Sequence, residues 1–135
     1  MRNQDYKYTV LRYIEKVNDK DIDGLLDMMT EDFHFVDTLG GTVEGRSEMK
    51  EAWTRYFNMF PDYTINVFNI MKNENTIAIV GTAKGTYAVG GELREENSWE
   101  IPAAWKAIVR DDKLSSWRVF SDNQPVREII EKYRE

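Results

Sequence analysis

Asp122 is the acid in this sequence that is best placed for chemistry. It follows a predicted strand over residues 113–121 that carries tryptophan and phenylalanine, and it precedes a predicted helix that begins near Pro125. A carboxylate at the end of such a strand can lie at the floor of an apolar pocket and move a proton as a general acid or base. Ser121-Asp122-Asn123 is also a typical capping sequence for the helix that follows. The residues leave both interpretations open.

Asp37 and Tyr13 are the other candidates for chemistry. Asp37 ends a predicted strand over residues 33–37 just before a Gly-Gly turn. It could abstract a proton next to a carbonyl group, or its side chain could hold the turn by local hydrogen bonds. Tyr13 lies on the apolar face of a predicted helix, so its hydroxyl points inward and needs a partner. A core tyrosine and a hydrogen-bond donor to a ligand remain the two alternatives.

Aromatic residues make up 13% of the chain and could line a cavity for a small hydrophobic molecule. Strand alternation puts Trp99 and Trp105 on one face of a long strand, with the small Ala103 between them. Trp53 and Phe57 recur at helical spacing and could serve either as core residues or as cavity walls. We expect these four aromatic residues to form the substrate-binding walls.

Composition excludes several classes of function. The formal net charge of −6, from 24 acidic and 18 basic residues, disfavours nucleic acids and anionic membranes as partners. The chain has no cysteine and a single histidine, so we expect no metal site. No glycine-rich phosphate loop is present, and we expect no cofactor. The first residues lack the apolar segment of a signal peptide, so the expected location is cytoplasmic.

The helices and strands that carry these residues can be predicted from hydrophobic periodicity and turn signals. We expect one domain over residues 1–135, without linkers or repeats. Helical spacing predicts three early helices and a short one after Pro125, while β-branched and aromatic runs predict six strands. The predicted helices cover residues 4–18, 22–29 and 46–60, and the strands cover 33–37, 42–44, 63–71, 76–87, 92–110 and 113–121. This order indicates an α+β fold: a curved, largely antiparallel sheet wrapped around the three N-terminal helices.

Three local segments, together with this element order, resemble one known superfamily over essentially the whole chain. They are residues 12–17 with 20–23, residues 30–37 with Gly40 and 44–46, and residues 102–105 with 117–122. The first two are similar to ketosteroid isomerases and the third to SnoaL-like polyketide cyclases. Both are branches of the nuclear transport factor 2-like superfamily. The resemblance implies the cone-shaped fold with a ligand cavity between sheet and helices.

The resemblance also implies roles for the candidate residues. The isomerase branch puts Asp37 at the general base and Tyr13 at the oxyanion donor. The second acid of that branch falls near Ala103 or Ala104, so one of its two donors is missing. The cyclase branch selects Asp122 as the acid/base carboxylate.

Two functions follow from this interpretation. The first is a cofactor-free isomerase or cyclase that moves protons on carbon in a small hydrophobic carbonyl compound. The alternative is a non-catalytic small-molecule-binding or dimeric scaffold domain of the same fold. We expect a homodimer through the outer sheet face, with Val119 and Ile108 as candidate contacts.

Overall fold

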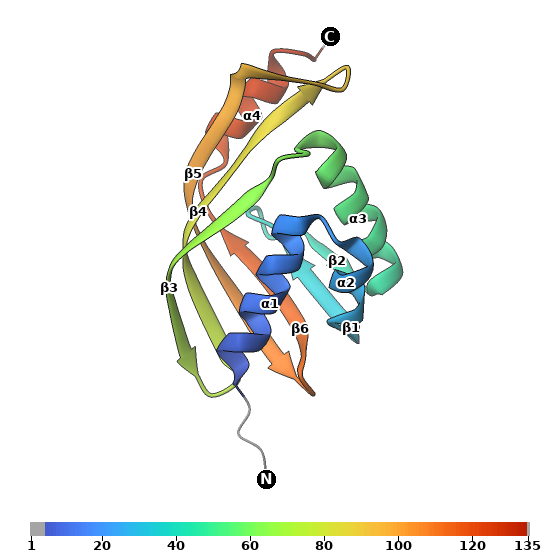
Figure 1. Cartoon of the computed structure of the whole chain (residues 1–135), viewed down its shortest axis with the longest axis vertical. Coiled ribbons are helices and arrows are strands. Elements are labelled where there is room, and N and C mark those ends of the chain that lie inside the picture. The colour runs from blue at the N-terminus through green and yellow to red at the C-terminus, as the bar shows by residue number, and fades with distance from the viewer. Residues whose placement is uncertain (1–4, 135) are drawn as a thin grey trace.

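The computed structural model describes residues 5–134, which form four helices and six strands (Figure 1). In chain order these are α1 (Tyr6–Asp19), α2 (Ile22–Asp27), β1 (Met29–Val36), β2 (Thr42–Glu44), α3 (Arg46–Met59), β3 (Thr64–Asn73), β4 (Thr76–Val89), β5 (Glu92–Arg110), β6 (Lys113–Phe120) and α4 (Gln124–Glu131). Aspartates begin the first two helices: the Asp5 carboxylate accepts from the Tyr8 amide, and Asp21 accepts from Gly24. Asp21 is the N-cap residue of α2.

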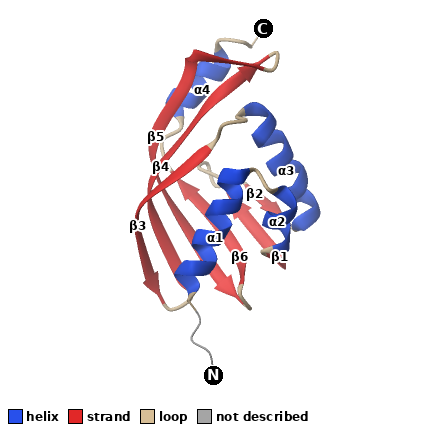
Figure 2. Cartoon of the chain, viewed as in Figure 1, coloured by secondary structure: helices blue, strands red, loops and turns tan. Residues whose placement is uncertain are grey.

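The six strands form one open, curved sheet in the order β2-β1-β6-β5-β4-β3. Neighbouring strands run antiparallel except β1 and β6, which pair in parallel. Helices α1, α2 and α3 lie together on one side of this sheet (Figures 1 and 2). The predicted α+β cone is therefore confirmed, with a mixed sheet.

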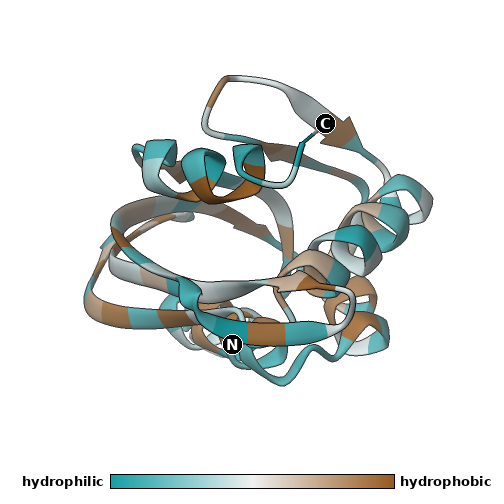
Figure 3. Cartoon of the chain, turned by 90° about the horizontal axis from the view of Figure 1, so that it is seen from above, coloured by the Kyte–Doolittle hydropathy of each residue, from teal (hydrophilic) through white to brown (hydrophobic). Residues whose placement is uncertain are grey.

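Strand alternation determines which residues form the core. Along β5, the odd-numbered residues from Trp99 to Val109 are buried, whereas most even-numbered ones point to the outer face. Hydrophobic and hydrophilic residues accordingly alternate along the strands in Figure 3. The inner face packs against apolar side chains of the helices, such as Val10, Tyr13 and Met49.

Gly81 marks a bulge that bends the sheet. The register between β3 and β4 shifts by one residue between Val67 and Asn69. A Cβ atom on Gly81 would collide with the backbone carbonyl oxygen of Asn66. Only glycine therefore fits there without moving the strand.

The structure differs from the predicted boundaries mainly around the first strand. Helix α2 ends at Asp27, and Met29, expected in the helix, already begins β1. The reason is tertiary: Met29 pairs with Leu114 of β6, a partner 85 positions later that local periodicity cannot reveal. Gln4, expected in the first helix, lies outside the described residues.

The hairpin of β4 and β5 extends beyond the helices, and α4 packs along this extension (Figure 1). Beyond the end of α4, the Tyr133 hydroxyl exchanges hydrogen bonds of 2.9 and 3.1 Å with the fully buried Asn97 amide of β5. The C-terminal segment therefore covers one end of the space between sheet and helices. No helix within residues 5–134 is long and apolar enough to cross a membrane.

Candidate functional site

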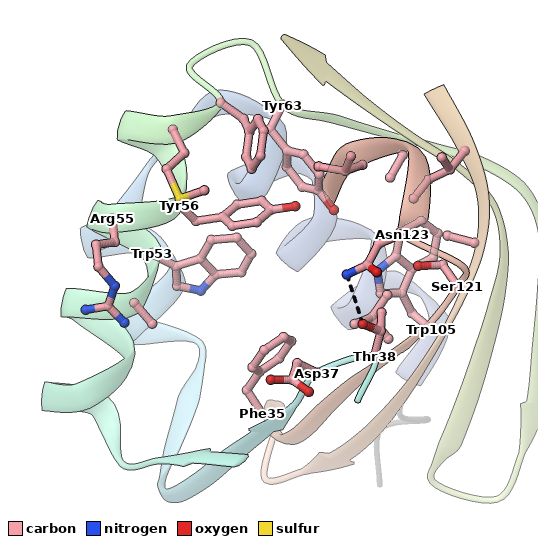
Figure 4. A pocket seen from close by; sticks show the side chains of 18 of the residues that line it. Phe35, Asp37, Thr38, Trp53, Arg55, Tyr56, Tyr63, Trp105, Ser121 and Asn123 are labelled. Carbon is pink, nitrogen blue, oxygen red and sulfur yellow. Dashed lines mark hydrogen bonds between the residues drawn. The ribbon is translucent and has the colours of Figure 1, made fainter. Parts of the chain in front are cut away.

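A cavity of about 390 Å³ lies between the sheet, α3 and α4 (Figure 4). Its volume falls within the range of small-molecule sites. Eight of the lining residues are aromatic, and they come from β1, α3, the segment after α3, β5 and β6: Phe35, Trp53, Tyr56, Phe60, Tyr63, Trp99, Trp105 and Trp117. Such a wall suits a flat apolar ligand.

Three of the four predicted wall residues line this cavity, namely Trp53, Trp99 and Trp105. Phe57 does not. It is buried and stacks on Trp53 with the ring centroids 4.9 Å apart, so it supports the wall from behind.

Asp37 lines the cavity and also holds a turn. Its Oδ1 accepts hydrogen bonds from the backbone amides of Leu39 (2.9 Å) and Gly41 (2.8 Å). Figure 4 shows the carboxylate beside Phe35 at the edge of the cavity. The two interpretations of Asp37 therefore do not exclude each other, because one oxygen serves the turn and the carboxylate still borders the cavity.

Asp122 does not lie at the cavity floor, which corrects its expected position. Its side chain is 79% exposed, and its Oδ1 accepts from the Gln124 amide at the start of α4. Alternation explains the difference: Trp117, Val119 and Ser121 point to the cavity, so Asp122 falls on the opposite side. Asp122 thus holds the first amide of α4 from one position before the N-cap, which is Asn123.

Tyr13 is fully buried but is not among the residues that line the cavity. Its ring packs against Trp117, with centroids 5.1 Å apart. Burial raises the pKa of the Tyr13 hydroxyl, and the nearby Trp53 indole partly offsets that rise. The two groups do not meet hydrogen-bond geometry, so both polar atoms lack a partner within the described residues. Tyr13 supports the cavity wall from the core.

The structure adds two tyrosines that the sequence interpretation did not select. Tyr56 of α3 and Tyr63, just before β3, both line the cavity, and their hydroxyls point toward each other in Figure 4. Their rings meet edge to face with centroids 4.9 Å apart. Tyr56 follows Trp53 by three positions on the apolar helix face, which is the signal that could have suggested it.

A polar cluster closes the other end of the cavity. The Asn123 amide donates to the Thr38 hydroxyl at 3.1 Å and accepts from Arg127 at 2.7 Å (Figure 4). Asn123 is also the N-cap residue of α4. The contact with Thr38 therefore fixes the start of α4 against the loop that carries Asp37.

Within residues 5–134, no group of three or more His, Cys, Asp or Glu side chains is arranged to hold a metal ion. The titratable side chains that border the cavity are Asp37, Arg55, Tyr56, Tyr63 and Arg127. The chemistry that this set can perform is hydrogen bonding to oxygen and proton transfer by a carboxylate.

The family model described as SnoaL-like domain matches residues 10–117. The chain belongs to this family. The match covers most of the sheet and the three helices on its concave side, and it confirms the resemblance to the nuclear transport factor 2-like superfamily. The comparison with curated proteins gives no match.

Solved structures share the fold of this SnoaL-like domain along nearly its whole length. A proposed SnoaL-like polyketide cyclase from Shewanella denitrificans has a TM-score of 0.82 at 14% identity, covering 96% of this chain and 99% of the other. AclR, a proposed hydroxylase from Streptomyces galilaeus, has a TM-score of 0.76 at 18% identity, with coverages of 96% and 97%. TerC, crystallised with polyporic acid, has a TM-score of 0.77 at 20% identity, with coverages of 93% and 98%. At these identities the likeness concerns the fold alone.

Proposed function

We propose that this SnoaL-like domain is an isomerase or cyclase that moves a proton on carbon in a small hydrophobic carbonyl compound. The observation that carries the proposal is the position of Asp37. Among the lining residues of the described chain it is the one carboxylate, and it borders a cavity that is otherwise mostly apolar. The family and the fold point to the same broad class of chemistry.

In this reaction the Asp37 carboxylate takes a proton from the carbon next to the carbonyl group. The electron pair of that C–H bond forms a carbon–carbon double bond, and the negative charge moves to the carbonyl oxygen. Return of the proton to another carbon gives an isomer. Attack of the carbanionic carbon on a second carbonyl carbon forms a ring bond instead, and the new alkoxide takes up the proton. A base and oxygen donors held in place suffice for both outcomes.

The turn hydrogen bonds favour this role as well. Oδ1 is held by two backbone amides, so the carboxylate has one fixed orientation relative to the cavity. A fixed base needs no reorganisation before it reacts. The same bonds also support the second candidate, a binding domain in which Asp37 only shapes the loop.

Deuterium uptake by α-tetralone in heavy water separates these candidates. The bicyclic ketone is small enough for the cavity and carries protons next to its carbonyl group. We expect the wild-type protein to accelerate deuterium uptake and Asp37→Asn to abolish that acceleration, with Asp122→Asn as the matched control. Binding of the ketone without any acceleration of deuterium uptake would support the binding-domain function and overturn the proposed enzymatic function.

We further propose that two copies of the chain associate through the outer sheet face. Val80, Ala104 and Phe120 are neighbours across β4, β5 and β6 on this face. Val80 is 41% exposed and Phe120 46%, and an exposed apolar band of this kind supports a contact between two copies of the chain. Val119 cannot contribute, because it lines the cavity on the opposite face. Ile108, the second expected contact, is half-buried.

Light scattering coupled to size exclusion tests this contact. We expect a mass of twice 15.9 kDa for the wild type. Phe120→Asp should give the monomer mass, whereas Leu39→Asp, at an exposed loop residue away from this face, should not. A monomeric wild type at high micromolar concentration would contradict the proposal.

A further inference from the structure

Tyr56 and Tyr63 bring two phenol hydroxyls to one end of the cavity. They reach it from opposite sides of the turn at Pro61, one from the last part of α3 and the other from the residue before β3. Figure 4 shows the hydroxyls turned toward each other, above the space bordered by Trp53 and Phe35. Asp37 lies on the opposite side of that space.

Both phenols are held rigidly. The Tyr56 ring packs edge to face against Phe60, with centroids 5.0 Å apart, and against Trp53 at 6.2 Å. The Tyr63 ring packs against Trp99 at 6.1 Å, and the Tyr63 amide donates to the Phe60 carbonyl at 3.0 Å. Donors that are fixed in this way are ready to stabilise charge as it develops.

The two hydroxyls are not equivalent. Burial raises the pKa of both, so both remain protonated donors at neutral pH. The neighbouring Tyr63 side chain lowers the pKa of Tyr56 somewhat, while Tyr56 raises the pKa of Tyr63 further. Tyr63 is only 6% exposed, whereas Tyr56 is half-buried, so Tyr56 is the more accessible donor of the pair.

We propose that the Tyr56 hydroxyl, supported by Tyr63, binds the carbonyl oxygen of the substrate. This inference rests on the proposed function and specifies its ligand. The ligand is an apolar ketone whose oxygen lies at the tyrosine end and whose acidic C–H group lies toward Asp37. Charge that leaves the C–H bond then collects on the oxygen next to Tyr56. Tyr56 thereby takes the donor role that the family resemblance gave to Tyr13, which the structure buries away from the cavity.

Binding of α-tetralone and of tetralin tests the inference. The two molecules have the same bicyclic frame, and only the ketone has an oxygen. We expect Tyr56→Phe to weaken binding of α-tetralone about three- to tenfold, as the loss of one hydrogen bond does, and to leave tetralin binding unchanged. Tyr63→Phe should weaken α-tetralone binding less. Tyr87→Phe, a half-buried tyrosine outside the cavity wall that contacts Phe60, is the matched control.

Each outcome has a separate meaning. Unchanged affinity of Tyr56→Phe for α-tetralone would overturn the oxygen-binding role while leaving the Asp37 exchange reaction standing. Equal weakening of both molecules would show a packing role for Tyr56 and would overturn the inference too. Failure of both molecules to bind the wild type would overturn the proposed function itself. Retained tetralin binding proves that each variant is folded.

Discussion

The Gly41 amide donates to Asp37 Oδ1 at 2.8 Å, and a Cβ atom on Gly41 would lie 2.8 Å from Oδ2 of the same carboxylate. The turn after β1 therefore closes directly over the candidate base, and the backbone of this glycine sets where the carboxylate points. The structural and the chemical role of Asp37 can be tested separately. Asparagine at this position removes only the charge, whereas alanine also removes the oxygen that accepts from the turn.

Asp37→Asn keeps an oxygen that can accept from Leu39 and Gly41 but removes the charge. We expect deuterium uptake by α-tetralone to fall at least about a hundredfold, the usual contribution of a general base. The free energy of unfolding should change by less than about 1 kcal/mol, whereas Asp37→Ala should lower it by about 1–3 kcal/mol because two amides lose their acceptor. Chemical denaturation and the exchange assay measure the two effects. Full activity in the asparagine variant would contradict the role of base.

Asp122→Ala is expected to leave the exchange reaction unchanged. The side chain is largely exposed and accepts from the Gln124 amide, so its loss should destabilise the start of α4 by about 0.5–1 kcal/mol. Thermal unfolding and the same exchange assay check both parts. A loss of activity comparable to that of Asp37→Asn would show that Asp122 takes part in the reaction.

Gly85→Ala is expected to narrow the cavity. A Cβ atom there would lie 3.1 Å from Cζ2 of Trp99 and 3.4 Å from Cβ of Phe60, and both residues line the cavity. The indole must move by a few tenths of an ångström toward the cavity, so tetralin should bind more weakly. Such overpacking should destabilise the protein by about 1 kcal/mol. Calorimetry of tetralin binding measures the effect. Unchanged affinity would show that the Trp99 indole does not move into the cavity.

Alkaline pH is expected to destabilise the protein through its buried tyrosines. Burial raises the pKa of Tyr13, Tyr56 and Tyr63 above the ordinary value of 10.0. Above about pH 10 the unfolded chain loses phenolic protons that the folded protein keeps, so the free energy of unfolding falls as the pH rises. Below that pH the contribution is fully present.

Denaturation at a series of pH values between about 9 and 12 measures this slope. Tyr13→Phe should reduce it by about one proton per molecule. Tyr8→Phe, at a side chain that is 58% exposed, is the control. An identical slope in the wild type and Tyr13→Phe would contradict the assigned burial of the hydroxyl.

Most helices and strands of this protein are predictable from its sequence, because helix and strand periods are local. The apolar spacing of Tyr13 and Val17 is enough to predict α1, and the alternation from Trp99 to Trp105 is enough to predict the inner face of β5. The Gly-Gly turn after Asp37 likewise predicts the break between β1 and β2. The α+β architecture follows from the order of these elements.

Which polar groups border the cavity depends on tertiary packing. Asp37 and Asp122 both follow strands, but the alternation beyond β6 carries Ser121, not Asp122, to the inner face. Tyr13 and Tyr56 both lie on apolar helix faces, but only the second borders the cavity. The apolar spacing along a helix predicts which side chains are buried. Whether a buried side chain borders the cavity depends on the curvature of the sheet and on the packing of α3 and α4.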